Sequence, residues 1–204
     1  DDNEFIDYVL GLGPITLGYS YPAVDNAIKK QLKDGISFSM PHYLEVDLSE
    51  KLSKIIPGAD MVRFTKTGSD AGTAAIRAAR AITKKDKILY WGSGGVWHDW
   101  FTTMTSRNAG IPKFNRNLIS KFEYNNLEFL KEKFDNWKDQ IAAIYMEPMI
   151  FEHPKNNFLK DVKKLAHKNN TVLIFDEVVT GFRYANGGAS EYLGIEPDIA
   201  VWGK

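Results

Sequence analysis

The sequence contains no cysteine, and its hydrophobic runs are short. The absence of cysteine excludes a disulfide scaffold, a metal site with cysteine ligands and a cysteine nucleophile, and it is consistent with a reducing compartment. The longest apolar run, residues 141–146, is interrupted by Glu147 and falls far short of the roughly 20 residues that a membrane-spanning helix needs. We therefore expect a cytoplasmic protein with no membrane partner.

An excess of charge of either sign is also missing. Lys plus Arg and Asp plus Glu both number 26, so the formal net charge is zero. No global positive field is present to attract nucleic acid or an anionic membrane surface, so a charged partner must be bound locally. The 204 residues are 44% hydrophobic and 25% charged, which is typical of a globular protein with one large domain or slightly more.

The two ends of the sequence predict a piece of a longer protein. It begins with Asp1, without an initiator methionine or the pattern of a signal peptide. It stops at Lys204, directly after a short apolar run. Because the last strand would then have an uncovered edge, we expect this chain alone to be a poor catalyst.

Helical and strand patterns alternate along the chain, which predicts a largely parallel sheet covered by helices on both faces. In such a sheet, ligands bind beyond the carboxyl ends of the strands. The pattern predicts helices over residues 22–33, 43–56, 71–83, 127–137 and 158–168, and strands over residues 61–64, 87–91, 141–146, 172–175 and 199–202.

A glycine turn precedes the third expected helix. In Thr67-Gly68-Ser69-Asp70, the glycine allows the backbone to approach a ligand, and the Ser69 hydroxyl and the amides at a helix N-terminus suit a phosphate. The alternative is that Ser69 or Asp70 only caps the helix.

An acidic pair follows the strand expected at residues 172–175. Asp176-Glu177 places one carboxylate at the tip of a buried strand, where it could hold a cation, take a proton or pair with a protonated ring nitrogen. The alternative is an acid that caps a helix or stabilises a turn.

Lys204 lies one small residue beyond the last expected strand, where Gly203 leaves it room. In a cleft, the pKa of a lysine can fall until the free amine is available to form a Schiff base. By its position alone, Lys204 is more simply explained as a solvated surface charge.

Together, a phosphate cradle, an acid for a ring nitrogen and an amine for an aldehyde meet the three demands of pyridoxal 5'-phosphate. A series of short motifs in fixed order carries a further resemblance. They are Gly13-Pro14, Leu17-Gly18, Pro22-Ala23-Val24, Ser37-Phe38-Ser39, Val62-Arg63-Phe64, Thr67-Gly68-Ser69-Asp70-Ala71, Ala75-Ile76-Arg77-Ala78-Ala79-Arg80, Glu147-Pro148, Phe175-Asp176-Glu177-Val178-Val179-Thr180-Gly181-Phe182-Arg183, Pro197-Asp198 and Gly203-Lys204.

This ordered set resembles the class III (subgroup II) aminotransferases of the fold-type I pyridoxal-phosphate superfamily, in the branch similar to glutamate-1-semialdehyde 2,1-aminomutase. The resemblance implies a three-layer α/β/α large domain, with residues 1–45 as the N-terminal segment of a small domain and residues 46–204 as part of the large domain. It also implies a homodimer that transfers an amino group between an amino donor and a keto or aldehyde acceptor.

The resemblance further implies roles for single residues. Lys204 would hold the cofactor as an internal aldimine and move the proton, and Asp176 would bind the pyridinium nitrogen. Val178 would press against the ring. Gly68 and Ser69 would hold the phosphate. Glu147 would support the side of the ring that bears the hydroxyl.

One stretch departs from the family pattern. Where the family usually carries Tyr-His-Gly, with the aromatic ring stacked on the cofactor, this chain has a glycine-rich segment, residues 92–95, followed by Trp97. Trp97 is then the candidate to lean over the ring. The glycine spacing does not fit a dinucleotide-binding motif, which leaves little support for that alternative.

Two alternatives remain open at this level: a 1,2-aminomutase of the glutamate-1-semialdehyde type, and a degenerate, non-catalytic relative. We expect no metal site, because His98 has no second ligand at metal spacing.

Overall fold

The computed structural model describes residues 2–94 and 96–204. Asp1, at the start of the predicted N-terminal segment, and Gly95, in the glycine-rich segment, lie outside the described residues. The chain divides into two compact units, one with residues up to Leu48 together with Lys204, and one with residues 49–203. The domain boundary between residues 45 and 46 stays a prediction.

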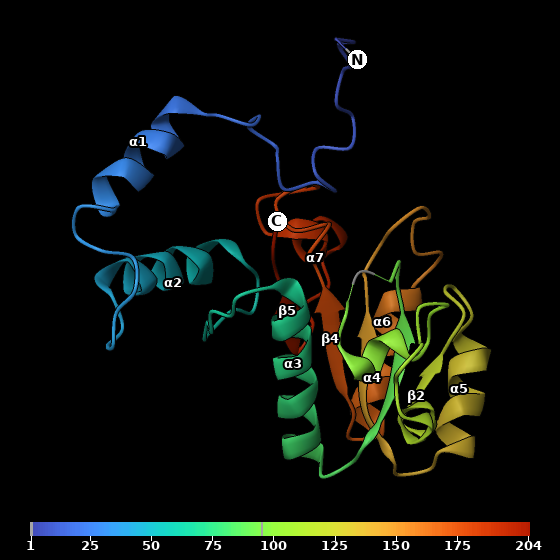
Figure 1. Ribbon diagram of the computed structural model, residues 1–204. Coiled ribbons are helices and arrows are strands. Elements are labelled where there is room, and N and C mark those ends of the chain that lie inside the picture. The colour runs from blue at the N-terminus through green and yellow to red at the C-terminus, as the bar shows by residue number, and fades with distance from the viewer. Residues whose placement is uncertain (1, 95) are drawn as a thin grey trace. The chain divides into compact units, whose positions relative to one another are not determined.

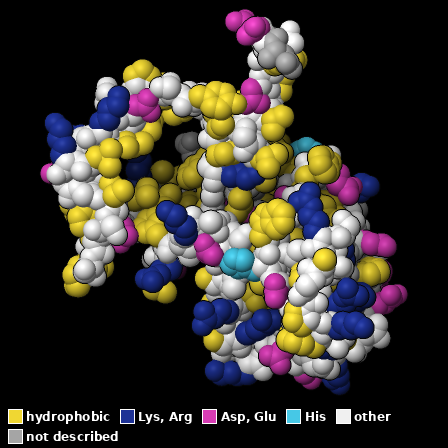
Figure 2. Space-filling model, viewed as in Figure 1, with side chains coloured by type: hydrophobic (Ala, Val, Ile, Leu, Met, Phe, Trp, Pro, Cys, Tyr) yellow, Lys and Arg dark blue, Asp and Glu magenta, His cyan; other side chains and the backbone are white. Residues whose placement is uncertain are grey.

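The first unit contains α1, Pro22–Gln31, and the start of α2, Tyr43–Ile55. Pro22 occupies the first turn of α1, where its missing amide hydrogen costs no helical hydrogen bond. Neither helix has a buried residue. Figure 2 shows many hydrophobic side chains on the surface, and those of the first unit that are largely exposed include Phe5, Ile6, Tyr8, Leu12 and Tyr19.

The second unit is built on a five-stranded, fully parallel sheet with the order β2-β1-β3-β4-β5. Helix α3 covers one face, and α5 and α6 cover the other (Figure 1). The strands are β1 (Lys87–Trp91), β2 (Ile119–Lys121), β3 (Ile141–Met146), β4 (Val172–Asp176) and β5 (Ile199–Val201), and the helices are α3 (Gly68–Thr83), α4 (Asp99–Thr102), α5 (Leu127–Asn136), α6 (Phe158–Lys168) and α7 (Gly188–Leu193), with a 3₁₀ turn at Lys113–Asn117.

Both faces of the central strands are buried, because alternate side chains enter two separate hydrophobic clusters. On β3, Ile144 and Met146 belong to the cluster under α5 and α6. Ala143 and Tyr145 belong to the cluster under α3. This double burial explains why the strand is a continuous apolar run in the sequence rather than an alternating one.

The expected α/β architecture with a parallel sheet is confirmed, but the strand predicted at residues 61–64 is wrong. These residues form no strand in the described structure. A strand is stable only when its backbone groups pair with a neighbour. No ladder among the described strands includes these four residues.

Candidate functional site

The candidate site lies at the carboxyl edge of the sheet. From β1 the chain goes first to β2 on one side and then to β3 on the other side, so the strand order reverses between β1 and β3. In open parallel sheets, ligands bind outside the carboxyl ends of the strands at such a switch. Gly92, Glu147 and Asp176 stand at the ends of β1, β3 and β4, as the sequence predicts for the two acids.

Asp176 is the last residue of β4 and is 9% exposed. Its Oδ1 accepts a hydrogen bond from the amide of Val178 at 3.0 Å. Its Oδ2 accepts one from the hydroxyl of Tyr145 at 2.7 Å. Because the carboxylate is bonded at both oxygens, its plane is fixed at the strand tip.

Val178 lies between two glycines that come from distant parts of the sequence. A Cβ added to Gly68, at the start of α3, would lie 3.0 Å from a Val178 methyl carbon. A Cβ added to Gly203, after β5, would lie 3.4 Å from Val178. The two glycines therefore allow the backbones of α3 and of the β5 end to pack close to the valine that follows Asp176.

The N-terminus of α3 is capped by Thr67, not by Ser69 or Asp70. The Thr67 hydroxyl accepts a hydrogen bond from the Asp70 amide at 3.1 Å, and the Asp70 carboxylate accepts from the Thr67 amide at 3.0 Å. The amides of Gly68 and Ser69 occupy the first two helical positions, which have no intrahelical partner. They remain suited to an anion at the positive end of the helix dipole.

The segment that carries Trp97 is attached to this helix start. The Trp97 amide donates to the Ser69 hydroxyl at 3.1 Å. His98 Nδ1 lies 2.6 Å from the Thr73 hydroxyl, and the Trp100 indole donates to the same hydroxyl at 2.8 Å. Trp97 is 66% exposed, with the Arg107 guanidinium 5.4 Å from the centroid of its ring.

Glu147 is buried and is bonded to the segment after β1. Its Oε1 accepts from the Ser93 amide at 2.5 Å and from the Ser93 hydroxyl at 2.7 Å. The carboxylate therefore ties the ends of β1 and β3 together across the switch point. A Cβ at Gly92 would lie 2.8 Å from Glu147 Oε1, so glycine is required for this approach.

The second acid of the Asp176-Glu177 pair has a structural role. Glu177 is fully buried, and its carboxylate accepts hydrogen bonds from the amides of Ala189 and Ser190 at 2.9 and 2.7 Å. It also accepts from the hydroxyls of Ser190 and Thr180. Glu177 therefore holds the start of α7, while Asp176 faces Tyr145.

Lys204 belongs to the first unit, where its ammonium group donates a hydrogen bond to the Leu12 carbonyl. In the chain it directly follows Gly203, where an added Cβ would lie 3.4 Å from Val178. The described geometry thus brings together Gly68, Val178 and Gly203. That the Lys204 amine joins them is part of the proposal below.

Two residues of the site were not found from the sequence. Tyr145 carries the only hydroxyl on β3, and Ser93 supplies two hydrogen bonds to Glu147. The signal for Tyr145 was a polar tip in an otherwise apolar strand, since a buried tyrosine hydroxyl usually has a hydrogen-bond partner. The sequence did not identify which partner this was.

Buried tyrosines are expected to make the second unit less stable at alkaline pH. Burial, followed by the nearby carboxylates, raises the pKa of Tyr90 and of Tyr145 well above the ordinary value of 10.0. A raised folded-state pKa means that the folded chain keeps protons that the unfolded chain loses, so the stability is complete below about pH 10 and falls above it.

We expect Tyr145→Phe to make this alkaline loss shallower by one proton, about 1.4 kcal/mol per pH unit. Urea unfolding at a series of values from about pH 9 to pH 11 measures the slope. An unchanged slope would show that Tyr145 ionises in the folded chain as readily as in the unfolded chain.

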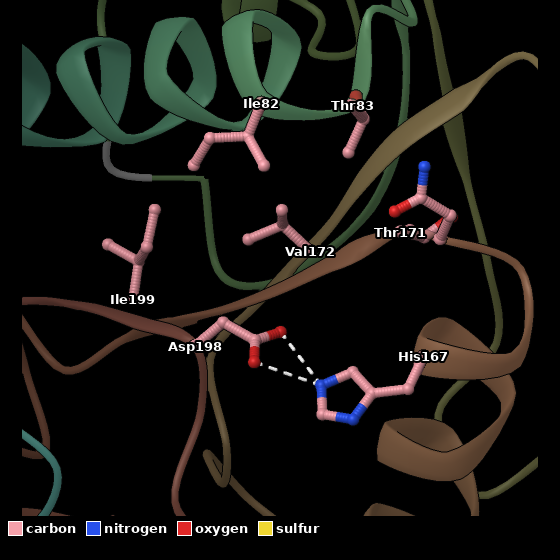
Figure 3. A pocket seen from close by; sticks show the side chains of 8 residues that line it. Ile82, Thr83, His167, Thr171, Val172, Asp198 and Ile199 are labelled. Carbon is pink, nitrogen blue, oxygen red and sulfur yellow. Dashed lines mark hydrogen bonds and ion pairs between the residues drawn. The ribbon is translucent and has the colours of Figure 1, made fainter.

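A separate hollow of about 430 Å³ lies at the opposite, amino edge of β4 and β5. In it, His167 Nε2 lies 2.9 Å from Asp198 Oδ1 (Figure 3). Asp198 Oδ2 also accepts a hydrogen bond from the Leu173 amide. The Thr171 hydroxyl donates to the Ile141 carbonyl. These polar groups hold the strand ends together, which is a structural role.

Within residues 2–94 and 96–204, no group of three or more His, Asp and Glu side chains could hold a metal ion. The same part of the chain contains no helix long and apolar enough to cross a bilayer.

Comparison with known proteins gives one consistent result. The sequence model for the family described as "Aminotransferase class-III" matches residues 1–204. A glutamate-1-semialdehyde 2,1-aminomutase of Methanococcoides burtonii is 39% identical over 224 residues, which cover 100% of this chain and 52% of that protein. The chain spans about half the length of the curated relatives it matches.

Solved structures agree in fold. An omega-transaminase from Sphaerobacter thermophilus superposes with a TM-score of 0.91 and 27% identity, over 97% of this chain and 50% of that one. The PLP internal aldimine form of the FumI protein of Sphingopyxis sp. MTA144 superposes with a TM-score of 0.89 and 32% identity, over 98% of this chain and 49% of that one.

Proposed function

Because this chain belongs to the class-III aminotransferase family, we propose that it is the cofactor-binding part of a pyridoxal-phosphate enzyme that transfers an amino group between an amino donor and a keto or aldehyde acceptor. The observation that carries the proposal is Asp176, a buried carboxylate with both oxygens bonded, at a strand tip beside Val178. A carboxylate fixed in this way suits a cationic ring nitrogen.

The residues present fit this cofactor. The free amides of Gly68 and Ser69 at the start of α3 would bind the phosphate, and Asp176 would accept a hydrogen bond from the protonated ring nitrogen. Val178 would give the ring an apolar contact. When bound, the cofactor supplies an electron sink for the charge that forms on the substrate carbon.

Three further residues would complete the site. Glu147, held by Ser93, would support the side of the ring that bears the hydroxyl. The exposed ring of Trp97 would stack on the cofactor in place of the aromatic residue that the family usually has. Lys204 would attach the cofactor through Nζ, and its free amine would then move the substrate proton.

We expect the chain mixed with pyridoxal phosphate to develop a visible absorption band, which borohydride reduction fixes covalently on Lys204. Peptide mass spectrometry after reduction identifies the modified residue. The absence of a band at saturating cofactor would overturn the proposal and would favour a non-catalytic relative. Modification of a lysine other than Lys204 would overturn the assignment of the attachment site.

A second candidate function is a 1,2-amino shift within one substrate. It is favoured because the relatives at 38–39% identity are named glutamate-1-semialdehyde 2,1-aminomutase. The two functions share the first half-reaction and differ in whether the product leaves. Incubating the cofactor-loaded protein with a panel of amino donors separates them, since a transaminase releases a keto product and accumulates the pyridoxamine form.

We also propose a cytoplasmic homodimer. The first unit exposes large apolar side chains such as Phe5 and Tyr8, at 87% and 86%, and exposed apolar patches are typical of association surfaces. Light scattering measures the molar mass in solution, and a monomer at high concentration would contradict the dimer. Among the described strands, β5 pairs only with β4; because such an open edge favours association over a stable site, we expect this chain alone to turn over slowly.

A further inference from the structure

The hydroxyl of Tyr145 is a buried polar group that the proposed chemistry does not itself require. Tyr145 pairs in register with Ile174 on the neighbouring strand, so its side chain lies on the same face of the sheet as that of Asp176, two residues further along β4. The side chain of Tyr145 is fully buried, and its hydroxyl donates to Asp176 Oδ2 at 2.7 Å.

Three neighbours fix the position of this hydroxyl. Gly72 on α3 leaves the space that it occupies, because a Cβ there would lie 2.8 Å from the Tyr145 oxygen. The Trp100 ring packs edge-on against the Tyr145 ring, with centroids 5.2 Å apart. The Tyr90 ring lies on another side, at 6.1 Å. The hydroxyl therefore has little freedom to leave Asp176.

The same hydroxyl keeps its proton at pH values at which an exposed tyrosine would lose it. Burial, and after it the negative charge of Asp176, raises the pKa of Tyr145 far above its ordinary value. The proton thus stays on the tyrosine oxygen and is directed at the carboxylate.

We infer that Tyr145 is the positioning residue for Asp176: together with the Val178 amide, its hydroxyl holds the carboxylate in the orientation that the ring nitrogen of the cofactor requires. This inference rests on the proposed function. Each carboxylate oxygen can accept more than one hydrogen bond, so a bond from Tyr145 does not by itself prevent one from the cofactor.

Removing the hydroxyl takes away one of the donors that hold the carboxylate, which then has more freedom to rotate. We expect Tyr145→Phe to weaken pyridoxal phosphate binding by up to about tenfold, because a carboxylate that is no longer held must be ordered when the cofactor binds. We also expect the pH profile of the bound cofactor's absorption band to shift, since the band reports the environment of the ring.

Gly72→Ala tests the same contact from the other side. It retains the hydroxyl but places a methyl group where the hydroxyl lies, so it should weaken cofactor binding and shift the absorption profile in the same direction as Tyr145→Phe.

Thr171→Val is the matched control. It removes another buried hydroxyl next to the same pair of strands: Thr171 directly precedes β4 and donates to the Ile141 carbonyl at 2.8 Å, at the opposite edge of the sheet. Urea unfolding should show a similar loss of stability to that of Tyr145→Phe, while cofactor affinity and the absorption profile stay at the values of the unsubstituted protein.

The outcomes separate this inference from the proposed function. If the unsubstituted protein forms the borohydride-fixed adduct and Tyr145→Phe binds the cofactor with unchanged affinity and pH profile, the inference is overturned and the proposed function stands. If the unsubstituted protein forms no adduct, both are overturned.

Discussion

Replacing Lys204 with alanine is expected to abolish the covalent attachment of pyridoxal phosphate and to lower the rate of amino transfer by at least about 10²- to 10⁴-fold, the contribution of a positioned general base. The loss of the nucleophilic amine adds to this, because the cofactor can then no longer be held as an imine on the protein. Absorbance spectra, borohydride trapping and the rate of conversion to the pyridoxamine form measure the three consequences.

Lys164→Ala is the control for a general effect of removing a lysine. The Lys164 side chain is 79% exposed on α6, where it lies 3.7 Å from Asp161. An exposed pair of this kind contributes little to stability, so cofactor attachment should be unchanged. A Lys204→Ala protein that still yields a borohydride-fixed adduct would refute the role of Lys204.

Replacing Glu177 with alanine is expected to destabilise the second unit by roughly 3–5 kcal/mol, because several buried donors lose their acceptor at about 1–3 kcal/mol each. The change leaves the Ala189 and Ser190 amides without their acceptor at the start of α7. The carboxylate also lies close to Gly188, where a Cβ would be 2.7 Å from Oε2, so the cavity opens directly under the helix.

The free energy of unfolding in urea measures this effect. Glu128→Ala is the matched control, since the Glu128 side chain is 77% exposed and its pairing with Lys131 on α5 is a surface contact. That variant should lose no more than about 0.5 kcal/mol. A Glu177→Ala protein within about 1 kcal/mol of the unsubstituted protein would contradict the anchoring role of the carboxylate.

Periodicity alone located most of the second unit. The predicted bounds of β1, β3 and α6 agree with the structure, because each is a sustained pattern that ends at a polar or turn residue. Elements of a few residues, such as β2 and α7, were missed, since a three-residue strand or a six-residue helix has too short a pattern to recognise.

The strand expected at residues 61–64 shows the limit of local reasoning. Its residues are apolar enough for a strand, but strand formation depends on a neighbour that the local sequence does not specify. The N-terminus of α3 shows a milder limit. The sequence located the helix, and its anion binding stays a prediction. The structure shows that Thr67 is the N-cap residue and that the Ser69 hydroxyl accepts a hydrogen bond from the Trp97 amide.

By itself, the sequence determined the alternating α/β plan, the family and the candidate residues, because these depend on residue order and spacing. The resemblance singled out Asp176 as the candidate acid, but only the tertiary structure showed that its neighbour Glu177 holds α7. It also decided that Tyr145 contacts Asp176. Both facts depend on the register between β3 and β4 and on the packing of α3 and α7 against the sheet, and such contacts between residues far apart in the chain leave no local pattern in the sequence.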